Sequence, residues 1–217
     1  MGLTTGVPTV VMVAAGATRA QIGRLGPLLE KVVIPVAVAV GAAVVDEGRV
    51  GGVGAMLGEA CRRKKAPFPL IGVAPERGRA GDDTASSEGL DPSHSHFVVV
   101  PADRPGWAAA WTSWVASALA GGNRSVALVT SGGDGAWESV AEHTEAGRLV
   151  VAVARTGGVA DHLAAALKGN AADPRAAPLA ASGQVYAVDP AKGAAYVAAL
   201  LRSALSRPDA LGPGRQA

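Results

Sequence analysis

The chain has 217 residues, with 20 Lys and Arg against 18 Asp and Glu, one cysteine, and 49% hydrophobic but only 4% aromatic residues. A formal net charge of +2 gives no electrostatic argument for a nucleic-acid partner. The 29 glycines and 14 prolines follow no period, and apolar residues are abundant, which excludes collagen-like, low-complexity and disordered chains. We expect one domain over residues 1–207 and a flexible tail over residues 208–217.

Short valine-rich runs alternate with segments of helical periodicity along the whole chain. The apolar runs are continuous, which indicates strands covered on both faces, as in parallel sheets. The strands are expected at residues 9–14, 43–45, 70–73, 97–100, 126–129, 149–153 and 185–188. The helices are expected at residues 21–31, 54–63, 107–119, 136–144, 159–167 and 191–205. This order predicts an α/β fold with a doubly wound, mainly parallel sheet of about seven strands.

Two segments fall outside this alternation. Residues 76–93 are polar and rich in Gly and Ser, which predicts a long loop of the kind that carries function or moves. Residues 170–184 are rich in Ala and Pro and are expected to form a surface connection.

The longest apolar stretch, residues 32–45, is interrupted by Pro35 and Gly41. It is shorter than the ~18–20 residues that span a bilayer, so we expect buried core and no membrane span. The first residues carry no basic segment of the kind that opens a secretory signal, and we expect a cytoplasmic protein.

Cys61 stands alone, which rules out an intrachain disulfide. The cations at 62–65 would lower its pKa and make it reactive, but we interpret it as a small buried residue near a helix end.

In an open parallel sheet, ligands bind where strands end and helices begin, because glycine lets the backbone approach a phosphate and the helix presents free N–H groups. Three turns of this chain have that form. The first lies at residues 45–56, and its candidate ligand-binding residues are Asp46, Gly48, Arg49, Gly51 and Gly52. Its glycine spacing departs from GxGxxG, and no acidic residue follows about twenty positions on, so it matches the dinucleotide fingerprint weakly.

The second turn reads GGxGxxE and directly follows an expected strand. Gly132, Gly133 and Gly135, with Asp134 between them, would admit a phosphate or a ribose, and Glu138 would face the ligand from the first helical turn. The alternative is a tight turn in which Glu138 only stabilises the helix N-terminus. Three glycines and a carboxylate favour ligand binding.

The third turn again joins a strand to a helix. Thr156, Gly157 and Gly158 would cradle an anion, with Arg155 as a counter-charge, while Asp161 would anchor the turn or lie near the ligand. Three such turns at one edge of a sheet predict a binding site for a nucleotide-sized anion.

His94 and His96 precede an expected strand, and their i, i+2 spacing places both rings on one face. Such a pair occurs in metallohydrolases, but the valines that follow supply no further ligand. His143 and His162 lie on expected helices, and nothing brings them to this pair. We therefore expect hydrogen-bonding roles for the histidines and no metal site.

Two catalytic motifs are absent from the sequence, the GxSxG elbow and the P-loop. Trp107, Trp111 and Trp114 follow helical spacing, which predicts packing; stacking of one of them on a base is the minority alternative.

These blocks, in this order, resemble the SLOG superfamily, and specifically its prokaryotic TRPM-like branch of the LSDAT type, over about residues 7–205. The most specific segments are 45–60, 69–75, 89–97, 131–138 and 156–161. The block LDPSHSHF is similar to a segment of the cytosolic N-terminal domains of TRPM channels. The resemblance implies a Rossmann-like fold that senses nucleotides or NAD-derived ligands such as ADP-ribose.

The second turn also resembles the GGxGTxxE signature of the Lonely Guy phosphoribohydrolases of the same superfamily. Ala136 stands where that signature has threonine, and Glu138 stands one position before its glutamate. The first turn departs from the family's DGGT pattern at residues 46–49. Gly158 stands where TRPM domains commonly carry arginine, for which Arg155 would compensate.

We expect a binding or sensor module for a nucleotide-derived ligand, with no required cofactor, in which Asp46 and Glu138 meet ribose hydroxyls. One alternative is an N-glycosidic hydrolase of nucleoside monophosphates, in which Glu138 would be catalytic. A weaker alternative is a metal-dependent hydrolase using His94 and His96. The expected partners are the small ligand and no nucleic acid, with a homo-oligomer or a separate membrane or effector partner left open.

Overall fold

The computed structural model describes residues 2–76, 89–101, 105–121 and 124–206. Most of the loop predicted at 76–93, and the whole tail predicted at 208–217, therefore lie outside the described residues.

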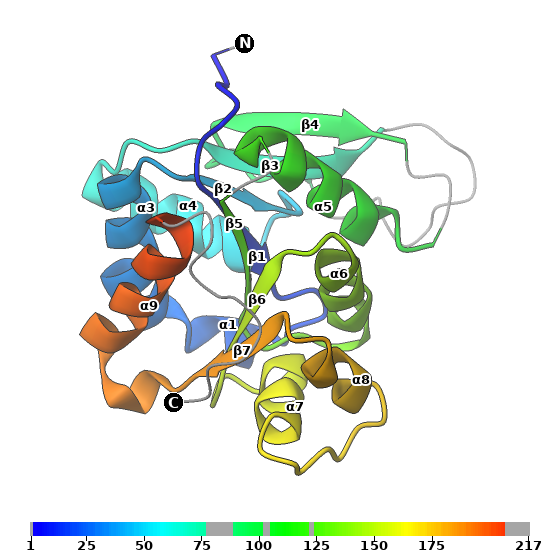
Figure 1. Ribbon diagram of the computed structural model, residues 1–217. Coiled ribbons are helices and arrows are strands. Elements are labelled where there is room, and N and C mark those ends of the chain that lie inside the picture. Colours follow the sequence, from blue (N-terminus) through cyan, green and yellow to red (C-terminus); the bar gives the residue numbers. More distant parts are fainter. Residues whose placement is uncertain (1, 77–88, 102–104, 122–123, 207–217) are drawn as a thin grey trace.

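Seven parallel strands form one sheet in the order β4-β3-β2-β1-β5-β6-β7 (Figure 1). The strands are β1 (Thr9–Val13), β2 (Ala43–Asp46), β3 (Leu70–Pro75), β4 (His96–Val100), β5 (Ser125–Val129), β6 (Leu149–Val153) and β7 (Val185–Val188). Every predicted strand is present, with ends that differ by at most two residues. The predicted Rossmann-like α/β class is confirmed, and the sheet is parallel throughout.

The helices are α1 (Arg19–Gly23), α2 (Gly26–Leu28), α3 (Ile34–Val40), α4 (Val53–Lys64), α5 (Trp107–Ala120), α6 (Asp134–Glu145), α7 (Gly158–Ala166), α8 (Ala176–Ala181) and α9 (Ala194–Ser206). A π-helical segment, η1 (Leu29–Val33), precedes α3, and a 3-10 turn, η2 (Pro190–Lys192), precedes α9. Helices α1–α4 and α9 cover one face of the sheet, and α5–α8 cover the other (Figure 1).

Alternate side chains of each strand pack against the helices on opposite faces of the sheet. Val10 and Met12 of β1 pack into the core beneath α2–α4 and α9, whereas Val11 and Val13 pack beneath α5–α7. This two-sided burial explains why the strands read as continuous apolar runs in the sequence.

The order of the strands reverses beside β1. Strands β2, β3 and β4 follow outward on one side, and the chain then crosses back to add β5, β6 and β7 on the other. Because all strands are parallel, the turns after β1, β2, β5 and β6 meet at one edge of the sheet, where open α/β folds bind ligands.

The helix predicted at 21–31 is longer than expected. Helical structure runs with small interruptions from Arg19 to Val40. Pro35 does not end it: the chain widens into the π-helical segment just before, and the proline lies in the first turn of α3, where no helical N–H is required of it. Gly41 ends α3 with a left-handed φ of 65°. The apolar stretch is therefore mostly helix, and only its end is strand β2.

The connection predicted at 170–184 contains a helix that the sequence analysis missed. Helix α8 buries Ala176 against the core beneath α7. Six residues rich in alanine give too little periodicity to recognise from sequence.

The tryptophans of α5 do not all pack as predicted. Trp107 and Trp111 lie partly buried against the core, but Trp114 is 61% exposed and meets Trp111 edge to face. Cys61 is half-buried, and burial raises the pKa of its thiol to about 11, which opposes the reactive alternative.

Within the residues that the structure describes, no helix has both the length and the apolar character needed to cross a bilayer.

Candidate functional site

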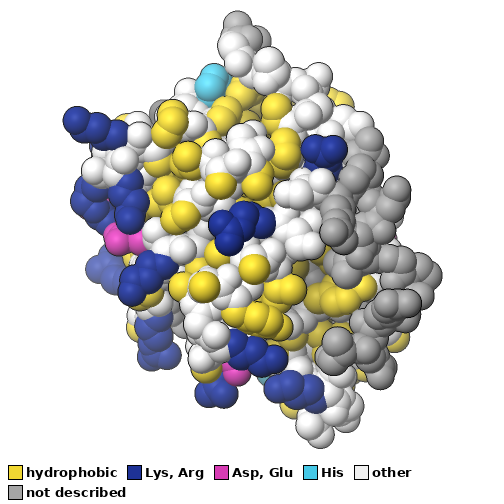
Figure 2. Space-filling model, turned by 60° about the vertical axis from the view of Figure 1, so that its left-hand side comes forward, with side chains coloured by type: hydrophobic (Ala, Val, Ile, Leu, Met, Phe, Trp, Pro, Cys, Tyr) yellow, Lys and Arg dark blue, Asp and Glu magenta, His cyan; other side chains and the backbone are white. Residues whose placement is uncertain are grey.

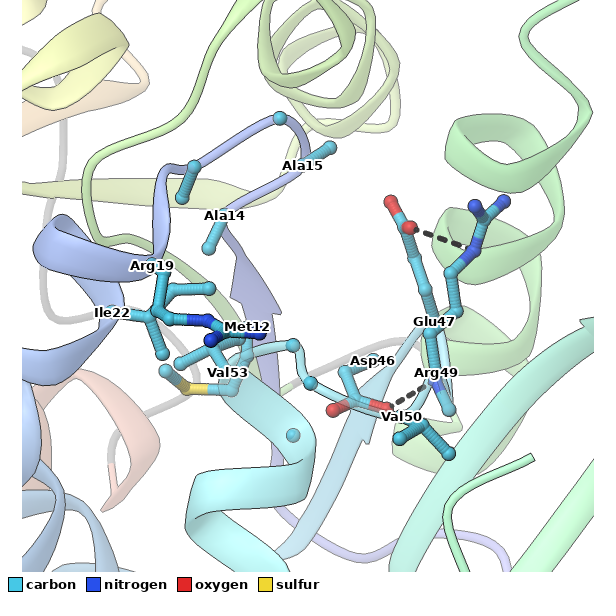
Figure 3. Close-up of a pocket in the computed structure, with 16 residues that line it drawn as sticks. Met12, Ala14, Ala15, Arg19, Ile22, Asp46, Glu47, Arg49, Val50 and Val53 are labelled. Atoms are coloured by element: carbon cyan, nitrogen blue, oxygen red, sulfur yellow. Dashed lines mark hydrogen bonds and ion pairs between the residues drawn. The ribbon is translucent and has the colours of Figure 1, made fainter. Parts of the chain in front are cut away.

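A cavity of about 390 Å³ opens at the carboxyl edge of the sheet, between the turn after β1 and the turn after β2 (Figure 3). On one side, β1, the turn after it and α1 contribute Met12, residues 14–17, Arg19 and Ile22. On the other, the end of β2, the turn after it and the start of α4 contribute residues 46–54. The volume falls in the lower part of the range of small-molecule sites, which is roughly 300–1,000 Å³.

The turn after β2 folds tightly back over β3. The Asp46 carboxylate accepts a hydrogen bond from the Gly48 amide at 2.7 Å, which closes an Asx turn. Gly48 has a φ of 64°, and a Cβ there would lie 2.8 Å from the Cα of Gly72 and 2.7 Å from the Phe97 ring. Glycine at both 48 and 72 is therefore what lets the turn lie against the strand.

His94 holds the Asp46 carboxylate from below the turn. Its Nε2 lies 2.9 Å from Asp46 Oδ1, and its Nδ1 lies 3.2 Å from the carbonyl oxygen of Asp91. Burial lowers the pKa of the His94 imidazole, but the hydrogen bond and charge of Asp46, with smaller help from Asp91, outweigh burial and raise that pKa overall. Two oxygen partners on one ring favour an imidazolium that neutralises Asp46.

The rest of the LDPSHSHF block wraps the same turn. The Asp91 amide donates to the Gly48 carbonyl at 3.0 Å, and the Val50 amide donates to the Gly89 carbonyl at 3.1 Å. Gly58 on α4 leaves room for the Ser93 side chain, since a Cβ there would lie 2.4 Å from that of Ser93. The block that carries the family resemblance thus supports the turn that lines the cavity.

Helix α4 begins at the wall of the cavity. Gly52 is the N-cap residue, no side chain among the described residues makes a capping hydrogen bond, and the first turn of the helix has no acidic residue. Gly54 lies so close to Asp46 that a Cβ would overlap the carboxylate. The first amides of α4 therefore border the cavity with the positive end of the helix dipole.

Arg19 lines one side of the cavity, and Asp46, Glu47 and Arg49 line the other (Figure 3). Glu47 and Arg49 form an ion pair at 3.5 Å. Desolvation raises the pKa of Glu47, Arg49 opposes this rise and Asp46 adds to it. Since Asp46 is held by His94 and Glu47 by Arg49, the excess positive potential comes from Arg19 and the end of α4.

The turn after β1 is the part of the site that sequence reasoning missed. It begins with three small residues, 14–16, and Thr18 then opens α1 with a capping box shared with Gln21. The sequence carries a signal for this turn, a strand followed by Gly16 and a T-x-x-Q pair, but the turn lacks the glycine-rich pattern of the three predicted turns. Arg19 is the first residue of α1 and reaches the cavity.

The second predicted turn lies beside the cavity and braces it. The Gly133 amide donates to the Ala15 carbonyl at 2.8 Å, and a Cβ on Gly133 would lie 2.9 Å from the Gly16 oxygen. Asp134 is exposed and pairs with Arg175 at 3.0 Å.

The carboxylate of Glu138 lies near Gly106, on the side of α5. Gly132, Gly133, Asp134, Gly135 and Glu138 are therefore close in the chain but outside the lining of the cavity.

The third predicted turn is locked to the second. The carbonyl of Gly132 accepts from the Val159 amide at 3.0 Å, and that of Ser131 accepts from the Ala160 amide at 3.1 Å. Thr156 accepts from the Ser131 amide at 2.9 Å. The first amides of α7 are thus already engaged by carbonyl groups.

The remaining residues of the third turn also bind one another. Asp161 accepts from the Gly157 amide at 3.1 Å and from the Arg155 amide, so it anchors the turn. The Arg155 side chain pairs with Asp189 at 3.0 Å. Arg155, Thr156, Gly157, Gly158 and Asp161 lie outside the cavity lining.

The two histidines of the HxH pair lie in different environments. His94 is buried before β4 begins, whereas His96 opens the strand and meets the Ser95 hydroxyl at 2.9 Å. No cluster of three metal-binding side chains occurs in the described parts of the chain. The hydrogen-bonding role predicted for His94 is confirmed.

The fold is similar to several solved structures. The protein TM1055 matches with a TM-score of 0.57 and 19% identity, over 84% of this chain and 92% of that one. The molybdenum cofactor carrier protein of Chlamydomonas reinhardtii matches with a TM-score of 0.54 and 18% identity, over 90% and 98% of the two chains. The molybdenum cofactor binding protein of Rippkaea orientalis matches with a TM-score of 0.51 and 15% identity, over 86% and 91%. These TM-scores show a shared fold.

None of the curated proteins compared with the chain matches it. The family described as SLOG in TRPM, prokaryote, matches residues 7–199, which is most of the chain and includes both turns that line the cavity. The chain therefore belongs to the prokaryotic family of SLOG domains related to those of TRPM channels.

Proposed function

We propose that the chain is a binding or sensor module whose cavity takes a small phosphate-bearing ligand derived from a nucleotide, of the ADP-ribose type. One observation carries the proposal: an uncapped helix N-terminus and an arginine border the same cavity. Backbone amides and a helix dipole at such a position favour an anion.

The ligand phosphate would lie against the amides of Val53 and Gly54, at the start of α4, with Arg19 on the facing wall. Arg19 enters none of the ion pairs among the described residues, so no described carboxylate competes with the phosphate for it. A charge-assisted hydrogen bond from a guanidinium to phosphate is stronger than one between neutral groups.

A ribose hydroxyl would be recognised by Glu47 rather than by Asp46. Asp46 is 3% exposed and its Oδ1 is taken by the Gly48 amide and by His94. Glu47 is part-exposed and stands at the cavity wall.

The hydrolase alternative gains no support from the geometry. Glu138, its one candidate catalytic group, does not line the cavity and stands beside the start of α5. We therefore propose binding without hydrolysis and with no cofactor of the protein's own.

The proposal is tested by calorimetric titration and thermal unfolding with ADP-ribose, AMP, inorganic pyrophosphate and, because two structural neighbours carry it, molybdenum cofactor. A ligand at about 100 times its Kd should stabilise the fold by about 2.7 kcal/mol. ADP-ribose should bind, and Arg19→Gln should weaken binding roughly tenfold because a charged hydrogen bond is lost.

Arg24→Gln is the matched control, since Arg24 ends α1 and lies outside the cavity lining. If none of the phosphate ligands shifts the unfolding temperature at millimolar concentration, the proposal is wrong. Release of free base from AMP would instead support the hydrolase.

A further inference from the structure

The two helical layers carry opposite charge, which the net charge of +2 conceals. Segments 19–40, 53–65 and 194–206, which make up one layer, contain eight cations and two carboxylates. The cations are Arg19, Arg24, Lys31, Arg62, Arg63, Lys64, Lys65 and Arg202. Both carboxylates, Glu30 and Glu59, pair with Arg63. Figure 2 looks onto this layer, the basic face, where Lys and Arg surround hydrophobic side chains and few acids are visible.

The opposite layer, the acidic face, is formed by α5–α8, and these four helices contain five carboxylates and no Lys or Arg. Arg175 at the start of α8 neutralises one of them, Asp134. Arg148 lies beneath the layer and is 4% exposed. The outward charge is an acidic stripe at i, i+4 and i+7 on α6, formed by Glu138, Glu142 and Glu145.

Each face also exposes large apolar side chains beside its charges. On the basic face, α3 and α9 lie side by side, with Val38 43%, Tyr196 39% and Leu200 39% exposed. On the acidic face, Trp114 is 61% exposed. It follows Ser113, whose hydroxyl reaches the Glu142 carbonyl at 3.5 Å, so the tryptophan lies one residue from the contact between α5 and α6.

We propose that the basic face of one copy of this chain docks on the acidic face of a second copy. The apolar residues of α3 and α9 then meet Trp114, and Lys31 and Arg202 meet Glu142 and Glu145. Apolar contact supplies affinity, while the complementary charges orient the two copies. The contact joins unlike surfaces, so it repeats along a stack or closes into a ring.

A second copy fits these surfaces better than an anionic membrane does. A membrane would account for the basic face alone and would leave the exposed tryptophan and the acidic stripe without a partner. Two copies account for both faces, and two basic faces would repel each other, which excludes a symmetric pairing through that side.

The experiment is sedimentation velocity of the full chain over micromolar to near-millimolar concentration, at about 0.01 M and about 1 M salt, where the Debye lengths are about 30 Å and 3 Å. We expect association that grows with concentration at low salt and falls at least tenfold at high salt. Charge reversal of either face, by K31E/R202E or by E142K/E145K, should abolish it, while K31R/R202K should preserve it.

The decisive experiment is sedimentation of a mixture of the two charge-reversed variants. In each variant alone, residues 31 and 202 carry charges of the same sign as residues 142 and 145, so the contact is repulsive and the variant stays monomeric. A mixture restores opposite charges at this contact and should associate again. Circular dichroism checks that both variants are folded. A wild type that stays monomeric at low salt overturns the proposal, and so does association that survives both reversals. Binding of anionic phosphatidylserine vesicles without self-association would assign the basic face to a membrane instead.

Discussion

The turns after β2 and β6 have similar glycine content, but the structure uses their glycines in opposite ways. In the turn after β2, the glycines let the chain fold over β3 and leave the first amides of α4 at an open cavity. In the turn after β6, they let two backbones interlock, and carbonyl groups of the preceding turn take the first amides of α7. A glycine-rich turn before a helix becomes an anion site only when no carbonyl of the chain reaches the helix end first.

The largest expected effect comes from adding a methyl group to the interlocked turn. Gly158 has a φ of 58°, and a Cβ there would lie 2.0 Å from the Gly132 carbonyl oxygen, with no flexible side chain to move aside. Gly158→Ala should lower the free energy of unfolding by about 3–5 kcal/mol, measured by urea denaturation.

Gly51→Ala is the matched change in the open turn. Gly51 has a φ of 80°, but no described atom lies within 4 Å of the added Cβ, so only the cost of the left-handed conformation, about 1–2 kcal/mol, is expected. Equal losses at 51 and 158 would contradict the distinction between the two turns.

The second prediction compares one arginine from each turn. Arg49 lines the cavity, whereas Arg155 pairs with Asp189 outside it. Arg49→Gln would leave the Glu47 carboxylate without its ion-pair partner at the cavity wall, where it would repel the phosphate, and should weaken ADP-ribose binding roughly tenfold. Arg155→Gln should leave binding within about twofold, and both are measured by calorimetric titration. A larger loss of affinity at Arg155 than at Arg49 would place the ligand at the turn after β6 and contradict the proposal.

The third prediction concerns the support beneath the open turn and is smaller. Because the folded pKa of His94 is raised, its pairing with Asp46 stabilises the fold fully below the unfolded pKa of about 6.5. That stability is lost as pH rises through the folded pKa. Urea unfolding should therefore show His94→Gln costing more at mildly acidic than at alkaline pH.

His96, which is half-buried in the same segment, serves as the control for this pH dependence, since its hydrogen-bond partner among the described residues is the Ser95 hydroxyl. His96→Gln should leave the pH profile of stability as in the wild type. If the difference in the free energy of unfolding between the wild type and His94→Gln were the same at every pH, the pKa of His94 would not change on folding, and the prediction would be wrong.

The fold could be predicted from sequence because each strand is a continuous valine-rich run, a local signal of two-sided burial. The predicted helix ends at residue 31, before an apolar run that Pro35 interrupts, and only the π-helical segment before the proline shows why helical structure continues through it. The short helix α8 has too few periodic positions to be recognised.

Of the candidate site, the turn at residues 46–52 could be found because its residues are adjacent in the chain and follow a strand. Arg19 could not, since it comes to the cavity only because β1 and β2 are neighbours in the sheet. Sequence also could not show that Gly132 and Gly158 face each other, which depends on the pairing of β5 with β6.

The most direct test of the binding site follows the glycine amides by ¹⁵N NMR during titration with ADP-ribose. The turn after β2, which lines the cavity, and the turns after β5 and β6, which lie outside it, each contain glycines whose amide signals report on ligand binding. We predict that the amides of Gly51, Gly52 and Gly54 shift progressively, while those of Gly132, Gly133 and Gly157 stay nearly fixed. Shifts confined to the second set, with the first set unmoved, would contradict the assignment of the ligand to the cavity between the β1 and β2 turns.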